Sequence, residues 1–328
     1  MRPRESSQFG RELVQITPLE PQSAPLPTFG DDLMRLVEQF LQSLDVKSSS
    51  RSGYRSFIRP FMIWVEKANV LSPTRQDILA YKHYLAKQKL SSATISSYLV
   101  AVRRFFEWAE GMKLYPNIAK GIKGTKRPRG FRKDPLTVDQ VLELFQSVCR
   151  DDLIGKRDIS LLNLLVRTGI RTVEAIRADI GDIRQNTGET VLWVHGKGRD
   201  SKDDFVVLTP NALKPINDYL QLRNEISESA PLFISHSNRS LNRRLTTRSV
   251  SRIIRFYLQR VGVASIRITP HSLRHTAITL SLQGGASIQE ARALGRHSDI
   301  NTTLTYAHNL DRIARAPERK IDKVLTQA

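Results

Sequence analysis

The stretch that decides the fold is TPHSLRHTAITLSLQGGASIQEARALGRHSDINTTLTYAH, which spans residues 269–308. Its beginning predicts one helix. Residues 286–297 (ASIQEARALGRH) and 299–306 (DINTTLTY) predict two more. Asp299 and Asn301 are both suitable N-caps for the last helix, and the sequence leaves that choice open.

Four side chains in this stretch have a joint spacing that indicates chemistry: His271, Arg274, His297 and Tyr306. Pro270 suits a first helical turn, and residues 271 and 274 then share one helical face. The four supply a proton-transfer group, a fixed cation, a hydrogen-bond donor and a phenol nucleophile. Each residue alone also fits a capping, buried or ion-paired role. Together they favour attack on a phosphate diester.

The composition indicates a polyanionic partner. Lysine and arginine number 51 against 32 aspartates and glutamates, so the formal net charge is +19. Nucleic acid is favoured over a membrane surface, because no basic amphipathic anchor or lipidation signal is visible. No apolar run approaches the ~18 residues of a transmembrane helix. A chain of 328 residues, 40% of them hydrophobic, suits two globular domains.

The single cysteine, Cys149, excludes a disulfide within the chain and a cysteine-based zinc site. This usage fits a reducing cytosol. We expect Cys149 to be a small hydrophobic residue on an amphipathic helix.

The N-terminal part divides into a tail and a helical domain. Residues 1–28 are proline-rich, lack the apolar core of a secretory signal, and predict a disordered tail. Apolar residues at helical spacing follow, with Ser92 as the expected cap of the last helix. The basic residues of this domain that we expect to reach DNA phosphates are Arg55, Arg103 and Arg104. The four predicted helices span residues 31–44, 50–68, 76–88 and 91–112.

Residues 115–134 form the predicted junction between domains. Prolines and glycines break any helix there, and seven basic residues with no acid lie between positions 120 and 133. A flexible linker is one interpretation. A run of one charge sign favours a strap on the phosphate backbone, with Lys126, Arg127 and Arg129 as DNA contacts.

The second domain begins near residue 135 and mixes helices with short strands. Thr137 is the expected cap of its first helix, and Gly169 ends the second, so that Arg171 and Glu174 lie on one face of the next. Arg248 and Arg252 lie on a strongly basic helix and are expected DNA contacts. The predicted helices are 136–149, 157–168, 210–226 and 247–261; the predicted strands are 190–195, 204–208 and a short third at 232–235.

The turn between the first two strands, GKGRDSKD, places Lys197 between two glycines, so this loop could approach a ligand closely. The pattern of a P-loop, GxxxxGK[ST], is absent, so ATP use has no support.

These motifs together resemble the tyrosine recombinase (phage integrase) family. Those that carry the resemblance are TGIRTVE, HGKG, PHSLRHT, LGRHSDINTT and LTYAH. Their order, and the short spacing from His271 to Tyr306, resemble the Xer-like two-domain branch. The resemblance implies a mainly α fold: a SAM-like helical core-binding domain, and an α-rich catalytic domain with a small antiparallel β-sheet, which form a C-shaped clamp. The implied division is a tail (1–28), the helical core DNA-binding domain (29–114), a basic linker (115–134), the catalytic domain (135–310) and a C-terminal segment (311–328) that packs in cis or in trans.

The resemblance also implies the role of each site residue. Tyr306 would be the nucleophile, Arg171 and Arg274 would bind the scissile phosphate, and His271 would handle protons near the tyrosine. His297 would contact a phosphate oxygen, Lys197 would protonate the leaving 5′-oxygen, and Glu174 would help to build the site. Two departures stand out. Arg296 occupies a position where the family usually has glycine, and Lys202 is a rival to Lys197.

The function implied is site-specific recombination of double-stranded DNA through a covalent 3′-phosphotyrosine intermediate and a Holliday junction. No metal and no cofactor such as ATP is required, because arginines and lysine stabilise the charge. The implied assembly is a homo-tetramer, or a tetramer with a paralogous recombinase, in the cytoplasm on the nucleoid. The alternatives are a type IB topoisomerase-like enzyme and a non-catalytic DNA-binding protein with the same fold. Chromosome-dimer resolution and mobile-element integration both stay open as the biological role.

Overall fold

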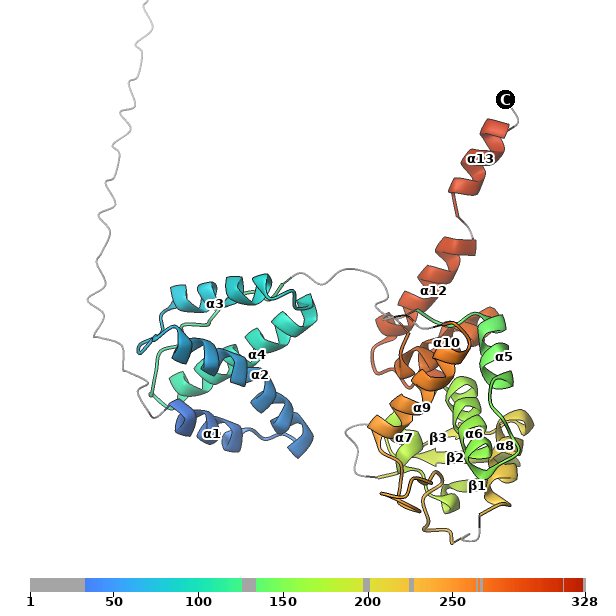
Figure 1. The fold of residues 1–328 in the computed structure, drawn as a ribbon. Coiled ribbons are helices and arrows are strands. Elements are labelled where there is room, and N and C mark those ends of the chain that lie inside the picture. Colours follow the sequence, from blue (N-terminus) through green and yellow to red (C-terminus); the bar gives the residue numbers. More distant parts are fainter. Residues whose placement is uncertain are drawn as a thin grey trace, which may run out of the picture. The chain divides into compact units, whose positions relative to one another are not determined.

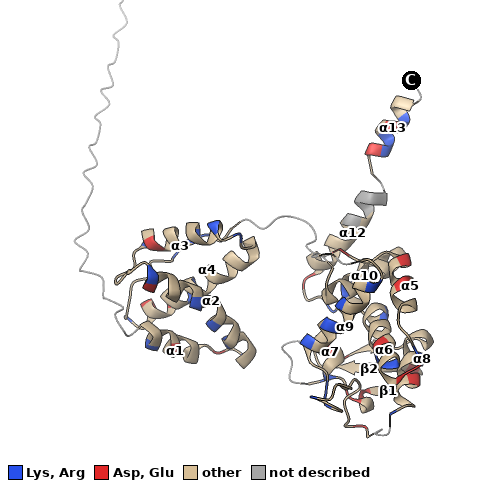
Figure 2. Cartoon of the chain, viewed as in Figure 1, with Lys and Arg blue, Asp and Glu red and all other residues tan. Residues whose placement is uncertain are grey.

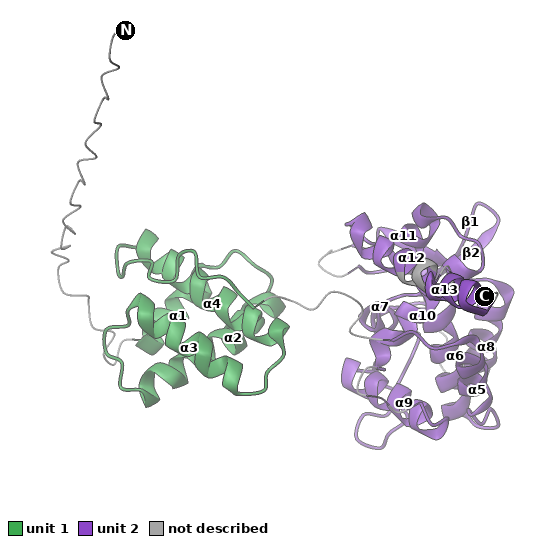
Figure 3. Cartoon of the chain, turned by 90° about the horizontal axis from the view of Figure 1, so that it is seen from above, with its two compact units in different colours: residues 1–128 green, residues 129–328 purple. Residues whose placement is uncertain are grey.

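The computed structural model describes residues 33–125, 134–196, 201–223, 227–263, 265, 268–314 and 316–326. The chain divides into two compact units, residues 1–128 and 129–328, which are coloured separately in Figure 3. The predicted tail and the predicted DNA contacts Lys126, Arg127 and Arg129 lie outside the described residues. Each unit is described by itself.

Within its described residues, the first unit contains four helices, as the periodicity predicts. They enclose a hydrophobic core rich in aromatic side chains, and Figure 1 shows their arrangement. Phe61 is fully buried, with the rings of Tyr81 and Phe106 at 5.1 and 6.0 Å between centroids. The expected cap at Ser92 is wrong: Ser91 accepts the hydrogen bond from the Thr94 N–H, and the helix begins one residue later. The helices are α1 (Leu33–Ser43), α2 (Ser48–Lys67), α3 (Arg75–Lys87) and α4 (Ser92–Gly111).

The second unit is built around a buried central helix, α6 (Leu153–Thr168), which packs against α8 and α10. Within the described residues, this unit contains eight other helices and a small sheet, and α13 extends away from its body (Figure 1). The helices are α5 (Val138–Gln146), α7 (Thr172–Arg177), α8 (Pro210–Leu220), α9 (Thr247–Arg260), α10 (Pro270–Gln283), α11 (Ile288–Gly295), α12 (Ile300–Ala314) and α13 (Glu318–Thr326), with a short 3-10 helix, η2 (Ile180–Asp182).

The sheet is antiparallel, in the order β1 (Ile183–Asn186), β2 (Glu189–Val194), β3 (Asp204–Val207). The expected third strand at 232–235 is wrong, because that segment forms only one isolated bridge, from Ile234 to Arg244. The strand that the sequence did not predict is β1. It pairs with β2 through a tight turn at Thr187 and Gly188, which both have positive φ. β1 is four residues long and mostly polar, so its hydrophobic pattern gives no signal.

Where the chain enters the second unit, its backbone is hydrogen-bonded to α10, the helix that carries the candidate site residues His271 and Arg274. The Leu136 N–H donates to Thr276 Oγ1 of α10 at 2.8 Å, and Thr276 is fully buried. The expected Thr137 cap of α5 is present as a capping box with Gln140. That helix ends at Gln146, earlier than expected. Cys149 therefore lies after the helix and is exposed, so the expectation of a hydrophobic residue on that helix is wrong.

The C-terminal end of the chain forms α12 and α13, separated at Pro317 as expected. Three apolar side chains of α13 are strongly exposed: Ile321, Val324 and Leu325. The fold class is as predicted, mainly α with a SAM-like first unit and a small antiparallel sheet in the second. Among the described residues, no helix is long and apolar enough to cross a membrane.

Candidate active site

Arg171 is positioned by the sharp end of α6. Gly169 closes that helix in the left-handed region, at φ +61°, where glycine carries no steric penalty. The chain then reverses so that Arg171 becomes the N-cap of α7. Glu174, fully buried one turn into α7, accepts hydrogen bonds from the Arg171 N–H (2.6 Å) and from its Nη1 (2.8 Å). The Arg171 guanidinium is thereby fixed at the start of a helix and stays partly exposed.

Arg274 comes from α10 and is buried between the ends of two other helices. Its Nη1 donates to the carbonyl of Gly169 at 2.5 Å, and its Nη2 donates to the carbonyl of Gly295. Burial, with the nearby charges of Arg171 and Arg296, lowers the pKa of Arg274 to about 10. The side chain is still a cation at neutral pH, and it is held by backbone carbonyls at the ends of α6 and α11.

Arg296 adds a third guanidinium that reaches the same carboxylate. It caps α11 in the left-handed conformation, at φ +43°, where glycine is the residue that suffers no strain. Its Nη2 lies 2.5 Å from Glu174 Oε2, and its Nε lies 3.7 Å from Asp204 of β3. Burial alone would raise the pKa of Glu174. Arg296 and Arg171 outweigh that effect and hold the pKa below its usual value.

Tyr306 lies in α12 with its hydroxyl inside the protein; only 3% of the residue is exposed. The hydroxyl is 2.5 Å from Nδ1 of His275, a residue that the sequence reasoning missed. Burial raises the pKa of Tyr306 to about 12, although the Arg274 cation acts in the opposite direction. The signal for His275 was present: it lies next to Arg274 and one helical turn after His271.

The two predicted histidines lie on either side of this pair. The His297 ring stacks on Tyr306 with 6.2 Å between centroids, and its Nδ1 is 3.0 Å from Thr303 Oγ1. Burial, with Arg274 and Arg171, lowers the pKa of His297 to about 4. His271 is exposed at the start of α10, with its ring 5.0 Å from that of His275. The structure therefore brings Arg171, Arg274, His271, His297 and Tyr306 into one cluster.

Two family models match the chain. Residues 135–312 match the phage integrase family, and residues 33–115 match the phage integrase N-terminal SAM-like domain. The chain belongs to the phage integrase family. This family consists of tyrosine recombinases, enzymes that cleave and rejoin DNA, and the chain is a site-specific DNA recombinase.

Relatives of this recombinase cover most of its length. The tyrosine recombinase XerC of Herpetosiphon aurantiacus is 28% identical over 289 residues, 84% of this chain and 91% of that protein. The TnP I resolvase of Bacillus thuringiensis is 30% identical over 297 residues, 84% of this chain and 95% of the resolvase. A crystal structure of XerH recombinase bound to its difH substrate has a TM-score of 0.66, 19% identity, and covers 86% of this chain and 83% of that one. The topoisomerase and non-catalytic alternatives are not favoured.

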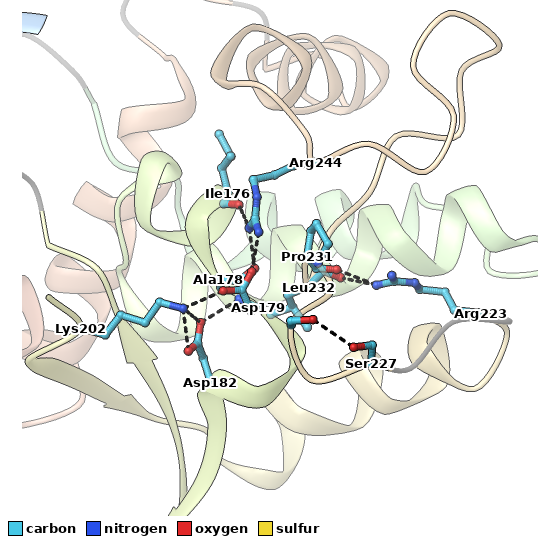
Figure 4. A network of polar contacts seen from close by, with 11 residues as sticks. Ile176, Ala178, Asp179, Asp182, Lys202, Arg223, Ser227, Pro231, Leu232 and Arg244 are labelled. Carbon is cyan, nitrogen blue, oxygen red and sulfur yellow. Dashed lines mark hydrogen bonds and ion pairs between the residues drawn. The ribbon is translucent and has the colours of Figure 1, made fainter. Parts of the chain in front are cut away.

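Of the two candidate lysines in this recombinase, only one is described. Lys197 lies outside the described residues. The Nζ of Lys202 is 2.7 Å from Asp179 and 2.7–2.8 Å from both oxygens of Asp182 (Figure 4). Burial alone would lower the pKa of Lys202, but these carboxylates outweigh it and raise the pKa. Arg244 completes the network on Asp179. Lys202 is thus engaged by the carboxylates of Asp179 and Asp182.

The predicted DNA contacts that are described are exposed, except Arg103, which is half-buried. Figure 2 shows how lysines and arginines are distributed along the helices of each unit. In the first unit, Arg55 pairs with Glu38 at 2.6 Å, Arg104 with Glu107 at 3.1 Å, and Arg103 donates to the Ile122 carbonyl at 3.2 Å. These contacts hold the side chains without burying them. In the second unit, Arg248 and Arg252 line a groove along α9 together with Arg255, Phe256 and Gln259.

Proposed function

We propose that this recombinase cleaves DNA with Tyr306 as the nucleophile and with Arg171 and Arg274 as the phosphate-binding cations. The observation that carries the proposal is the juxtaposition of a buried phenol with two histidine rings, beside the Arg274 guanidinium. Arginine matches the geometry of a phosphodiester with paired donors, and these two are already fixed by Glu174 and by backbone carbonyls. A fixed array of this kind stabilises the charge that develops in the transition state.

The proposed reaction exchanges one phosphodiester for another. The Tyr306 oxygen gives its proton to a neighbouring histidine of the cluster and bonds to phosphorus, the bond from phosphorus to the 5′-oxygen breaks, and Lys197 gives that oxygen its proton. His297 would donate a hydrogen bond to a phosphate oxygen, which requires a hydrogen on the ring nitrogen that faces the phosphate. His271 is exposed beside the cluster and would exchange protons with solvent. The bond energy is kept in the 3′-phosphotyrosine, so that the reverse attack by a 5′-hydroxyl rejoins DNA without ATP.

We infer further that two units joined by residues 115–134 clamp the duplex, with residues 1–28 as a tail. Arg55, Arg103 and Arg104 of the first unit, Lys126, Arg127 and Arg129 of the linker, and Arg248 and Arg252 of α9 would contact phosphates. The net charge of +19 supports this role.

Strand exchange between two duplexes requires several active sites, and we propose a tetramer of this chain, or of this chain with a paralogue. The apolar side chains exposed on α13 support packing of residues 311–328 against a neighbouring protomer. A substrate carried on chromosomal or mobile-element DNA supports a cytoplasmic, nucleoid-associated location.

A nicked suicide substrate tests the central assignment. The wild-type protein should accumulate a covalent protein–DNA adduct, because the short cleaved strand diffuses away and rejoining fails. Tyr306→Phe should bind the same DNA and form no adduct. Tyr84→Phe is the matched control: it removes the hydroxyl of an exposed tyrosine in α3 and should leave the adduct unchanged. Adduct formation by Tyr306→Phe would exclude Tyr306 as the nucleophile.

A further inference from the structure

The hydroxyl of Tyr306 lies against a basic side chain, His275. Nδ1 of the imidazole is 2.5 Å from the phenol oxygen, and the two rings lie 5.2 Å apart at an interplanar angle of 31°. The two residues come from different helices, α10 and α12, which pack against each other. Tyr306 is buried in a small cluster with Ile278 and Ala291. The contact is therefore held by the packing of the helices and not by a surface rotamer.

The protonation states make the phenol available as the donor in this hydrogen bond. The pKa of His275 is lowered to about 4 by burial, by His271, and by Arg274 and His297. Its imidazole is therefore neutral at physiological pH and has one ring nitrogen that accepts. The phenol, whose pKa is about 12, keeps its proton. In the tautomer that carries its hydrogen on Nε2, His275 accepts the phenolic hydrogen at Nδ1.

We propose that His275 is the catalytic residue that takes the phenolic proton of Tyr306 as the tyrosine attacks the scissile phosphate. The proposal rests on the function proposed above, in which Tyr306 is the nucleophile. The Oη–H bond breaks, the Oη–P bond forms, and the proton moves to His275 Nδ1. The leaving 5′-oxygen takes its proton from the separate acid. Rejoining reverses each transfer, so His275 returns the proton to Tyr306 and both residues are ready for another cycle.

Binding of DNA would raise the proton affinity of His275. The groups that face His275 are Tyr306 from α12, His271 and Arg274 from α10, and His297 before α12. The charges among them are positive, so they disfavour protonation of His275. A phosphodiester anion bound at Arg274 offsets that repulsion and raises the affinity of the imidazole for a proton. The tyrosine is thus poorly activated until a phosphate occupies the site, which limits attack on anything other than bound DNA.

The decisive experiment compares His275→Asn with His271→Asn in single-turnover cleavage of the nicked suicide substrate. Asparagine keeps an acceptor near the position of Nδ1 but has no basicity, so it separates proton transfer from hydrogen-bond positioning. We expect His275→Asn to cleave about 10²- to 10⁴-fold more slowly with unchanged DNA affinity. Its rate should rise about tenfold per pH unit from about pH 6 to 9, because hydroxide must now ionise the phenol. Wild type and His271→Asn should give flat profiles in that range.

A second measurement tests the same proton transfer by changing the pKa of the phenol at position 306. Replacing Tyr306 by a fluorinated tyrosine lowers the phenol pKa, so less help from a base is needed. Its introduction should restore cleavage by His275→Asn much more than it accelerates the protein that retains His275. A loss of activity caused by mispacking of α10 against α12 would not respond to the acidity of the phenol.

The outcomes separate the two proposals. His275→Asn that cleaves within a few fold of wild type, with a flat pH profile, would show that His275 only docks the hydroxyl. A tenfold rise per pH unit in His271→Asn instead would assign the proton to His271. Either result overturns the role of His275 and leaves Tyr306 as the nucleophile. A fluorinated Tyr306 that fails to restore His275→Asn also counts against it. Absence of any adduct from the wild-type protein would overturn both proposals.

Discussion

Arg296 Nη2 lies 2.5 Å from Glu174 Oε2, on the same buried carboxylate whose other oxygen holds Arg171. One negative charge is therefore shared between two guanidiniums. If Glu174 paired with Arg171 alone, it would neutralise much of the charge that Arg171 offers to a phosphate. Arg296 offsets part of the negative charge of Glu174, so less of that charge neutralises Arg171. Arg296, which precedes His297 at the end of α11, thus affects the charge of Arg171 at the start of α7.

We predict that Arg296→Met slows cleavage by about 10- to 100-fold, through weaker stabilisation of the phosphate in the transition state. The double variant Arg296→Met with Glu174→Gln should cleave faster than Arg296→Met alone, because the excess negative charge is removed with its partner. Single-turnover rates of the adduct measure both. A double variant that is slower than either single variant would indicate that Arg296 acts only as a structural tie.

Substrates with sulfur at the 5′-bridging position distinguish the two lysines. A thiol ionises near pH ~8.5, so a thiolate leaves without an acid. Lys197→Met should cleave normal DNA about 10²- to 10⁴-fold more slowly and recover on the sulfur substrate. Lys202→Met should lose thermal stability, because it removes the cation between Asp179 and Asp182, and any cleavage defect should be equal on both substrates. Specific recovery of Lys202→Met would make Lys202 the acid.

The ion pairs of Asp179 with Lys202 and Arg244 predict a stability that depends on pH. Hydrogen bonds from Lys202 and Arg244 outweigh burial and hold the pKa of Asp179 below its usual value of 3.8. A carboxylate with a depressed folded-state pKa stabilises the fold above the unfolded pKa, and this contribution is lost as pH falls through the folded value. Asp179→Asn should therefore lower the Tm by about 2–4 °C at neutral pH. The difference from wild type should shrink below about pH 4; a difference that persists in acid would contradict the charge argument.

The exposed apolar residues of α13 predict a role in assembly and not in cleavage. Ile321→Asp combined with Leu325→Asp should prevent tetramers on paired sites, because it places charge in a surface that packs on a neighbour. Adduct formation on the suicide substrate should be retained. Thr326→Asp adds a charge to the same helix without removing an apolar side chain, and serves as the control. Assembly is measured by the mass of the protein–DNA complex and by recombination between two sites.

The arginines of α9 predict a salt dependence. Each phosphate that is neutralised adds about 0.9 to the slope of log affinity against log salt. Arg248→Ala should lower that slope by about one and weaken binding similarly on all sequences. Lys214→Ala is the control: Lys214 is exposed on α8 and paired with Asp218. Equal effects of the two substitutions would indicate that α9 has no special place in DNA binding.

The sequence predicted most helices because their apolar residues recur at a helical period; α6, which is buried on nearly every side, was predicted from its apolar run instead. It failed where local signals are weak: β1 is short and polar, and Ser91 and Ser92 are chemically equal candidates for one cap. The residues of the site were found as a family pattern, but their partners were not. Spacing shows which side chains share a face of α10. It does not show that His275 meets Tyr306 of α12, or that Arg296 reaches Glu174 of α7.

The hydrogen bond from the Leu136 N–H to Thr276 joins the entry of the catalytic unit to the residue beside His275. Two residues of chain, 134 and 135, separate Leu136 from the segment 126–133. Thr276 is fully buried and follows His275 directly in α10, so the start of the second unit is anchored one residue away from the histidine that contacts Tyr306. The position of that histidine therefore depends in part on how the chain enters this unit.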